Sequence, residues 1–162
     1  MQIRIRATGQ VLLEHEWIKW VATTYAKSIS AMTADIYDRF DSDAVFEGAQ
    51  ATGGTVYQYS QRDGVEQQSD GKWYTKYILG PVFTDGETTA AEQEAAYKAQ
   101  KDTEQAASVR ASRTEKLKDC DWTQISDSTA DKATWATYRQ ELRDISAQAG
   151  FPWTVEWPVQ PV

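Results

Sequence analysis

Hydrophobic and polar positions alternate near the start of the chain. Ile3 and Ile5 alternate with polar neighbours, and a period of two is typical of a strand with one buried face. Gly9-Gln10 then separates this segment from the apolar residues 11–13. Because short apolar runs on both sides of a glycine turn tend to pair, we predict a β-hairpin here.

Two further strands are predicted in the middle of the chain. Residues 56–60 alternate aromatic and polar side chains, and residues 72–79 are rich in aromatic and β-branched ones, as strands commonly are. The polar link between them contains Asp63-Gly64 and Asp70-Gly71, which are strong turn signals. Gly80-Pro81 is expected to end this module.

Helical signals in the first half are weaker. Residues 14–27 place several apolar side chains on one helical face, but β-branched residues leave helix and strand both open. Thr33 precedes a short segment in which Ile36 and Phe40 lie four residues apart, and this predicts a short capped helix. Gly48, Gly53 and Gly54 are expected to lie in a loop.

The composition changes at about Thr88. Residues 88–118 consist largely of Ala, Glu, Gln and Lys without Gly or Pro, which predicts a helix about 45 Å long. Such a helix with a thin apolar stripe needs something to cover it, so it packs on the first module, bridges two modules through solvent, or pairs with its own copies. The stripe consists of three alanines and two larger apolar residues: Ala95, Ala99, Ala106, Val109 and Leu117.

A second helix is predicted over residues 132–148. Its apolar residues fall on one face and Gly150 provides a C-terminal stop; they are Trp135, Tyr138, Leu142 and Ile145. The two helices are expected to form a hairpin, in which Leu117 and Trp122 face this stripe. The proline-rich segment from Phe151 onward would then run extended along the hairpin, since proline is excluded from helix interiors and central strands.

The predicted fold class is therefore α+β. We expect a β-rich interaction module over residues 1–82, a long connecting Ala-rich helix over 83–119, and a helical hairpin with an extended Trp/Pro tail over 120–162.

Composition limits the classes of partner. The formal net charge is −7 and the pI about 4.7, which argues against nucleic acid or an anionic membrane as the main partner. The single cysteine, Cys120, excludes an internal disulfide framework and fits folding in a reducing cytosol. No apolar run approaches the ~20 residues that span a bilayer, and the first residues do not resemble a secretory signal.

Candidate chemistry is sparse. His15 is the only histidine and lies between two glutamates, whose side chains point away from it on either a helix or a strand. Cys120 lacks a nearby base and is expected to pack in a core. Gly53-Gly54 lacks the Lys-Ser/Thr of a phosphate-binding loop. The acidic residues Asp35, Asp38, Asp41 and Asp43 do not follow a calcium-loop order, and we expect a solvated helix face and loop. No enzyme, metal or cofactor signature results.

Recognition residues are better represented, with seven Trp and eight Tyr, residue types enriched at interfaces. Trp73, Trp122 and Trp135 are expected in the core. Arg139 and Arg143 share a helix face, and Arg139 is expected to pair with Asp121 or with a carboxylate of a partner. The residues predicted to bind a partner are two arginines and the aromatic and proline residues of the tail: Arg139, Arg143, Phe151, Trp153, Trp157, Pro158 and Pro161.

Residues 110–162 contain a composite motif. It consists of a basic helix ending in Leu-x-x-x-Asp-Trp, then Tyr-Arg-x-x-Leu-Arg-Asp-Ile, then an aromatic residue before proline, and a closing Trp-Pro-x-x-Pro. These places are filled by Leu117, Asp121, Trp122, Tyr138, Arg139, Leu142, Arg143, Asp144, Ile145, Pro152, Trp157, Pro158 and Pro161. With this motif the last third of the chain resembles phage tail-assembly chaperones and tail-fibre-assembly-like proteins. A looser similarity links Gly64–Gln67 and Trp73–Tyr77 to proteins of cyanobacterial phages.

The resemblance implies a non-enzymatic protein of a tailed phage, made in the host cytoplasm. The preferred hypothesis is a virion component that contacts tail, baseplate or fibre proteins, with a trimer as a possible assembly. The alternative is a transient assembly chaperone that does not remain in the particle. A third hypothesis is a carbohydrate-binding module in the first half, which would use Trp17, Trp20, Tyr57, Tyr59, Trp73 and Tyr74.

Overall fold

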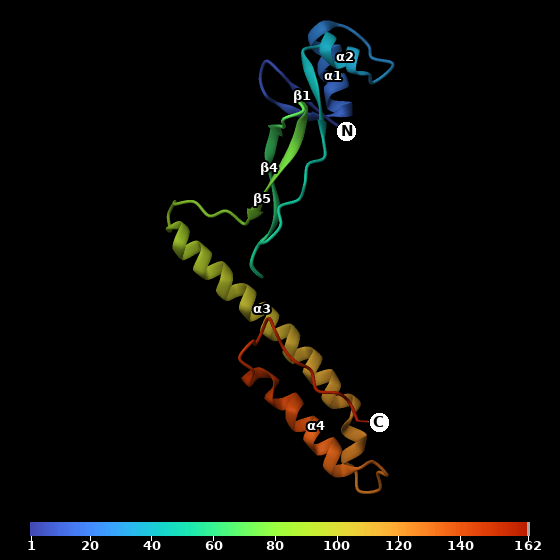
Figure 1. Ribbon diagram of the computed structural model, residues 1–162, viewed down its shortest axis with the longest axis vertical. Helices are drawn as coiled ribbons and strands as arrows, with labels where there is room; N and C mark the ends of the chain where they lie inside the picture. The colour runs from blue at the N-terminus through green and yellow to red at the C-terminus, as the bar shows by residue number, and fades with distance from the viewer. Residues whose placement is uncertain (162) are drawn as a thin grey trace. The chain divides into compact units, whose positions relative to one another are not determined.

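The computed structural model describes residues 1–161 and divides the chain into two compact units, Met1–Val82 and Phe83–Val162. We refer to them as unit 1 and unit 2. Unit 1 combines a sheet with two short helices, and unit 2 is helical (Figure 1). The predicted α+β fold class, with a β-rich first part followed by a long helix and C-terminal helices, is confirmed.

Unit 1 is built on a five-stranded sheet with the order β2-β1-β3-β5-β4. The neighbouring strands are antiparallel except β3 and β5, which run parallel. The strands are β1 (Gln2–Ile5), β2 (Val11–Leu13), β3 (Ser42–Phe46), β4 (Tyr59–Gln67) and β5 (Trp73–Gly80).

The predicted first hairpin is confirmed. Ile3 pairs with Leu12 across the β1–β2 ladder, and Ile3 and Ile5 are both buried. On its other side β1 pairs with β3, a strand that the sequence reasoning missed. Asp43 was expected on a solvated loop, but it lies in β3 opposite Arg4 and forms an ion pair with it.

Strand β4 begins later and ends later than expected. Residues 56–58 lie outside it, and the predicted turn at Asp63-Gly64 lies inside it, where the register with β5 shifts between Arg62 and Val65. A glycine with positive φ at position 64 accommodates this irregularity as part of a bulge. The chain reverses at Asp70-Gly71, as predicted.

Two helices cover the core of unit 1. The ambiguous segment forms α1 (Glu14–Tyr25), and the predicted capped helix forms α2 (Ala34–Arg39). Their buried side chains pack with those of β1, because both helices present apolar residues towards the sheet (Figure 1). The core consists of Ile3, Ile5, Trp17, Val21, Tyr37 and Phe40.

The long helix of unit 2, α3 (Ala90–Asp119), contains 30 residues and agrees closely with the prediction. Its first turn is fixed by a capping box: Thr89 Oγ1 accepts a bond from the amide of Glu92, while the Glu92 carboxylate accepts one from the amide of Thr89. Both bonds satisfy donors that a helix N-terminus leaves open. The bonds from Thr89 also lower the pKa of Glu92.

The second helix, α4 (Lys132–Asp144), is shorter than predicted because the chain tightens into the 3₁₀ helix η2 (Ile145–Ala147). Asp131 caps its N-terminus through bonds to the amides of Ala133 and Thr134. The 3₁₀ helix η1 (Asp121–Gln124) follows α3. The core of the hairpin consists of Val109, Cys120, Trp135, Tyr138, Leu142 and Ile145.

The apolar stripe of α3 is buried only in part. Ala106 and Val109 are buried and Leu117 packs on the same core, whereas Ala95 and Ala99 are exposed within unit 2. The C-terminal part of α3 therefore finds its cover in α4 and the tail (Figure 1).

Candidate partner-binding surfaces

Arg139 lies at the centre of the junction between α3 and α4. Its Nη1 atom donates to the carbonyl of Leu117 at 2.9 Å and contacts Sγ of Cys120 at 3.0 Å. Its Nη2 atom donates to Oδ1 of Asp121 at 2.8 Å. Of the two partners expected for Arg139, the structure shows the internal one, Asp121. The guanidinium is therefore used to close the hairpin.

The buried position of this group affects its titration and that of a neighbour. Burial acts to lower the pKa of Arg139, but the bonds to Asp121 and Cys120 outweigh it and leave the pKa raised. Burial also raises the pKa of Tyr138, helped by the negative potential of Cys120 and Asp119. The junction is thus arranged around a charged guanidinium and a neutral phenol at neutral pH.

The tail runs along α3 in the direction of that helix (Figure 1). Near its start, Phe151 lies under the guanidinium of Arg110, with 5.3 Å from Cζ to the ring centre. Further along, Nζ of Lys116 lies 5.4 Å from the ring centre of Trp157. Both rings pack against the core of the hairpin. The aromatic residues of the tail therefore contribute to the stability of unit 2 itself.

Polar contacts hold the same segment in place. Trp153 donates from Nε1 to Oδ1 of Asp102 at 2.6 Å. The side chain of Gln148 accepts from the amide of Glu156 and donates to its carbonyl, both at 2.8 Å. These bonds satisfy a stretch of backbone that lies outside any helix or strand, and so the tail follows one defined path.

A shallow groove lies between α4 and the tail. It is lined by Glu141, Gln148, Glu156, Trp157 and Pro158. Arg143, on the same helix, is exposed, and its guanidinium has no hydrogen bond or ion pair within residues 1–161. Of the residues predicted to bind a partner, Arg143 is therefore exposed, and Pro158 and Pro161 are half-buried.

The turn between the two long helices exposes two large apolar side chains, Trp122 at 52% and Ile125 at 55%. The prediction that Trp122 belongs to the core is wrong in this respect, although its ring meets that of Trp135 edge-on at 5.8 Å. Trp122 lies within η1, and Ile125 directly follows the end of this helix in an extended conformation. Ile125 carried no signal in the sequence beyond its apolar character.

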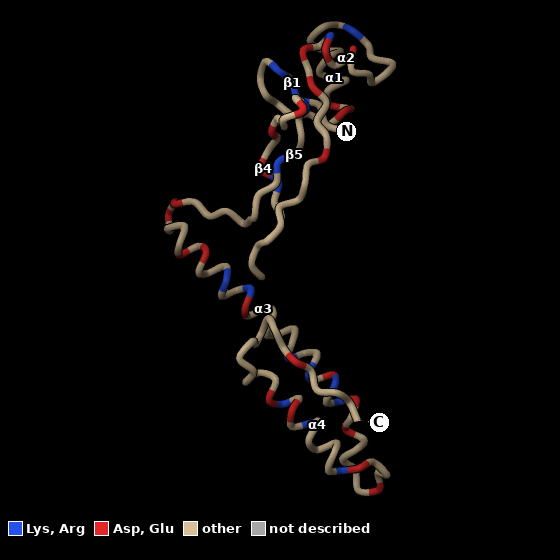
Figure 2. The backbone as a smooth tube through the Cα atoms, in the orientation of Figure 1, with Lys and Arg blue, Asp and Glu red and all other residues tan. Residues whose placement is uncertain are grey.

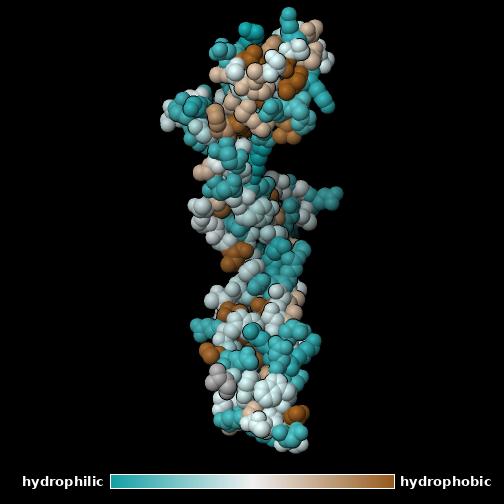
Figure 3. Space-filling view, turned by 90° about the vertical axis from the view of Figure 1, so that its right-hand side faces the viewer, coloured by the Kyte–Doolittle hydropathy of each residue, from teal (hydrophilic) through white to brown (hydrophobic). Residues whose placement is uncertain are grey.

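Outside this turn and Val159, the surface of unit 2 is largely hydrophilic. Figure 3 shows hydrophilic residues over most of the visible face, with small separate hydrophobic patches. Lys, Arg, Asp and Glu occur along the whole of α3 (Figure 2), and several pair with each other, as Lys98 does with Glu94. Because such exposed ion pairs contribute little energy, this part of the α3 surface is better suited to contact with water than to tight binding of a partner.

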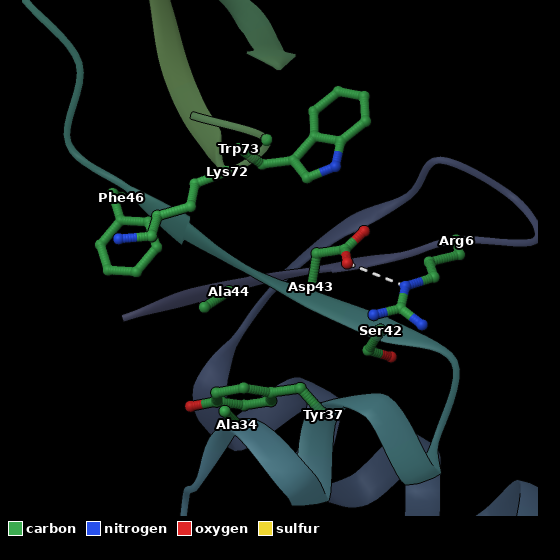
Figure 4. Close-up of a pocket in the computed structure, with 10 residues that line it drawn as sticks. Arg6, Ala34, Tyr37, Ser42, Asp43, Ala44, Phe46, Lys72 and Trp73 are labelled. Carbon is green, nitrogen blue, oxygen red and sulfur yellow. Dashed lines mark hydrogen bonds and ion pairs between the residues drawn. The ribbon is translucent and has the colours of Figure 1, made fainter. Parts of the chain in front are cut away.

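Unit 1 contains a pocket of about 250 Å³ beside β3 (Figure 4). Lys72 lies over the ring of Phe46 at 5.5 Å, and Arg6 donates from Nε to Asp43 at 2.8 Å. Bonds to Asp38 and Asp43 raise the pKa of Arg6. The pocket is lined by Arg6, Ala34, Tyr37, Ser42, Asp43, Ala44, Phe46, Gly71, Lys72 and Trp73.

The aromatic residues proposed for sugar binding do not form one platform. Trp17 is completely buried and donates from Nε1 to Ser42, so its inclusion was wrong. Trp20 packs edge-on against Tyr25. Trp73 stacks with the guanidinium of Arg4 at 3.9 Å.

Other kinds of site are also tested by the structure. Among residues 1–161, no group of three or more His, Cys, Asp and Glu side chains is placed to hold a metal ion. In the same part of the chain, no helix combines the length and the apolar character needed to cross a bilayer.

Residues 106–162 match the family model described as "Phage tail assembly chaperone protein". The match begins at the first buried residue of α3, Ala106, and includes the hairpin and the tail. It supports a phage tail-related role and contacts with tail proteins, and it favours an assembly chaperone over a structural component. No curated protein and no solved structure gives a significant match to the chain.

Proposed function

We propose that this protein is a phage tail assembly chaperone, which holds an unassembled tail protein through unit 2 and is absent from the finished tail. The observation that carries the proposal is the match of residues 106–162, because it covers the hairpin core, the Arg139 junction and the tail together. The preferred hypothesis from the sequence, a virion component, has weaker support.

The geometry of unit 2 suits a binding role. The tail is held against α3 by two cation–π contacts and by the bond from Trp153 to Asp102. A surface that is ordered before binding loses less conformational entropy on association. The residues proposed to meet the partner are those of the α4 face and the groove beside the tail, Arg143, Trp157 and Pro158.

The reaction of a chaperone of this kind is reversible association. The protein binds apolar surface that the tail protein buries later in its own assembly, and it dissociates when that surface is taken by the next tail subunit. Neither a cofactor nor a covalent step enters this scheme. Unit 1 is proposed as a second interaction module, and the trimer expected from the sequence stays a prediction.

Co-expression tests the proposal. Each tail protein of the same phage is produced alone and together with the full chain, and its soluble yield and its co-elution in size-exclusion chromatography are measured. We expect at least one tail protein to become soluble and to co-elute with the chain. A set of tail proteins whose solubility and elution are all unchanged would contradict the chaperone function.

A further inference from the structure

We propose that the turn between α3 and α4 is the main docking surface for the tail protein, with the groove beside the tail as a secondary contact, and that this turn takes a segment presenting apolar side chains flanked by Lys or Arg. The surface, called the hairpin tip below, consists of Asp119, Trp122, Ile125 and Asp127. This inference rests on the proposed function and deepens it, because it names the surface and the chemistry of the partner.

The apolar part of the hairpin tip is large for an exposed turn. About half of the area of both Trp122 and Ile125 is open to solvent, and tryptophan is the residue type most enriched among those that dominate binding energy. The Trp122 ring packs edge-on against the ring of Trp135, which is buried. The exposed indole ring of Trp122 is therefore anchored to the core of the hairpin.

The position of this contact is fixed by the Arg139 junction. Asp121 and Trp122 are consecutive residues of η1, and Arg139 holds Asp121 at 2.8 Å. Thr123, the next residue, is completely buried and donates from Oγ1 to the carbonyl of Cys120 at 2.7 Å. Because the residues on both sides of Trp122 are bonded to the core, the indole ring leaves η1 in a defined direction.

The basic residues around the hairpin tip already have partners. Lys118 pairs with Glu115 at 2.8 Å, and Nζ of Lys132 donates to the carbonyl of Ser126 at 3.3 Å. Lys116 lies over the ring of Trp157. Little positive charge therefore remains to meet an acidic partner.

Two acidic side chains of the hairpin tip, in contrast to these basic ones, have no partner among residues 1–161. Asp119 and Asp127 are exposed, and neither carboxylate has a hydrogen bond or an ion pair within the described part of the chain. Asp119 also lies in the last turn of α3, where the helix dipole is negative and an acidic side chain is unfavourable. Two free carboxylates on the same connection between α3 and α4 as the exposed indole ring therefore make this region complementary to a basic apolar segment.

The same charge argument excludes a second copy of the hairpin tip as the occupant. Two copies in contact would bring the free carboxylates together, and like charges at an interface oppose association. The committed occupant is therefore the tail protein, through a segment of the stated composition.

Model peptides test the chemistry on the full chain. Two synthetic amphipathic helical peptides share one leucine face, and their polar faces carry only lysine in one and only glutamate in the other. Binding is followed through the tryptophan indole resonances of the labelled protein, with Trp122 assigned from the spectrum of Trp122→Phe. We expect the lysine peptide to shift the Trp122 resonance, more weakly at high salt, and the glutamate peptide to leave it unchanged.

Variants decide whether the hairpin tip is responsible. Ile125→Ser should weaken binding of the lysine peptide about tenfold or more, as for a central interface residue. Asp119→Lys with Asp127→Lys should reverse the preference towards the glutamate peptide, and these exposed positions without partners leave the fold intact. The matched controls are Val159→Ser, an apolar residue 90% exposed in the tail, and Glu87→Lys, an exposed residue that precedes α3, and both should bind as the unchanged protein does.

The two levels of the proposal fail in different ways. A lysine peptide that does not bind, that shifts Trp153 or Trp157 instead of Trp122, or that binds the tip variants unchanged would overturn the docking surface. If the tip variants retain a co-expressed tail protein as well as the unchanged chain does, the docking surface is also overturned while the chaperone function stands. If the unchanged chain retains no tail protein, the chaperone function itself fails.

Discussion

The Nη2 atom of Arg139 on α4 lies 2.8 Å from Oδ1 of Asp121 in η1, the short helix that follows α3. The same guanidinium donates to the carbonyl of Leu117 in the last turn of α3. One buried side chain therefore joins three consecutive elements of unit 2. Because Asp121 is 63% exposed at its side chain whereas Arg139 is 11% exposed, the stability of the junction depends mainly on the arginine.

Replacing Arg139 with alanine should lower the free energy of unfolding of unit 2 by about 1–3 kcal/mol, because the guanidinium contacts to the Leu117 carbonyl, Cys120 Sγ and the Asp121 carboxylate are all lost. Arg139→Lys should restore only part of the loss, since an ammonium group cannot reach acceptors as a planar fork does. Urea denaturation monitored by hydrogen exchange of α3 and α4 measures both.

Arg143→Ala is the matched control, because Arg143 lies one helical turn away and is exposed. Its effect should stay within about 0.5 kcal/mol. Equal stability of Arg139→Ala and Arg143→Ala would show that the junction does not hold the hairpin.

In unit 1, Ser42→Ala should destabilise the fold by about 1–3 kcal/mol. Ser42 Oγ accepts from Nε1 of Trp17 and donates to the carbonyl of Phe40, both at 2.9 Å, and the hydroxyl is completely buried. The substitution leaves two buried polar groups without partners. Thr23→Ala removes an exposed hydroxyl that bonds to a carbonyl of α1, and a thermal shift as large as that of Ser42→Ala would refute the argument.

The N-cap of α4 should make unit 2 sensitive to acid. Bonds from the hydroxyl and amide of Thr134 and from the amide of Ala133 lower the pKa of Asp131 below its ordinary value of 3.8. A lowered folded-state pKa stabilises the fold above the unfolded value, and this contribution disappears as the pH falls through the folded pKa.

Asp131→Asn keeps an oxygen acceptor without the charge. We expect the unchanged protein to be more stable than this variant at neutral pH, and the difference between them to shrink as the pH falls through that range. Urea midpoints of the two proteins across the acid range provide the measurement, and a difference that stays constant with pH would contradict the assignment.

Trp157→Ala should release the tail from α3. The ring packs against the hairpin core and under Lys116, and the loss of this half-buried area should cost roughly 1–3 kcal/mol. Faster cleavage after residue 148 in limited proteolysis would report the release. Val159→Ser removes a side chain that is 90% exposed and should leave the cleavage rate unchanged; equal rates for both variants would contradict the packing.

Helix-favouring composition and the helical spacing of apolar residues made most of the helical fold predictable. The composition of residues 88–118 and the spacing of Trp135, Tyr138 and Leu142 predicted the two long helices, because each element is set by its own residues. The residues predicted for partner binding were found on α4 and in the tail, but their exposure depends on tertiary packing. Arg139 and the tail aromatics therefore proved to have partners inside unit 2.

Strand β3 escaped prediction for a physical reason. Its buried positions are Ser42 and Val45, and Asp43 between them is stabilised by Arg4 of the neighbouring strand β1 and by Arg6, which directly follows β1. A buried serine that bonds to Trp17 has no apolar signal. The complementary charges of Arg4 and Asp43 were the available indication, because opposite charges across neighbouring strands stabilise a pair.

The central claim is that the protein assists tail assembly without remaining in the tail. Quantitative peptide mass spectrometry of gradient-purified phage particles and of the infected-cell lysate tests it most directly. We predict abundant peptides of this chain in the lysate and none above background in the particles. A fixed copy number in the particles, relative to the major tail protein, would contradict the account and establish a structural component of the virion.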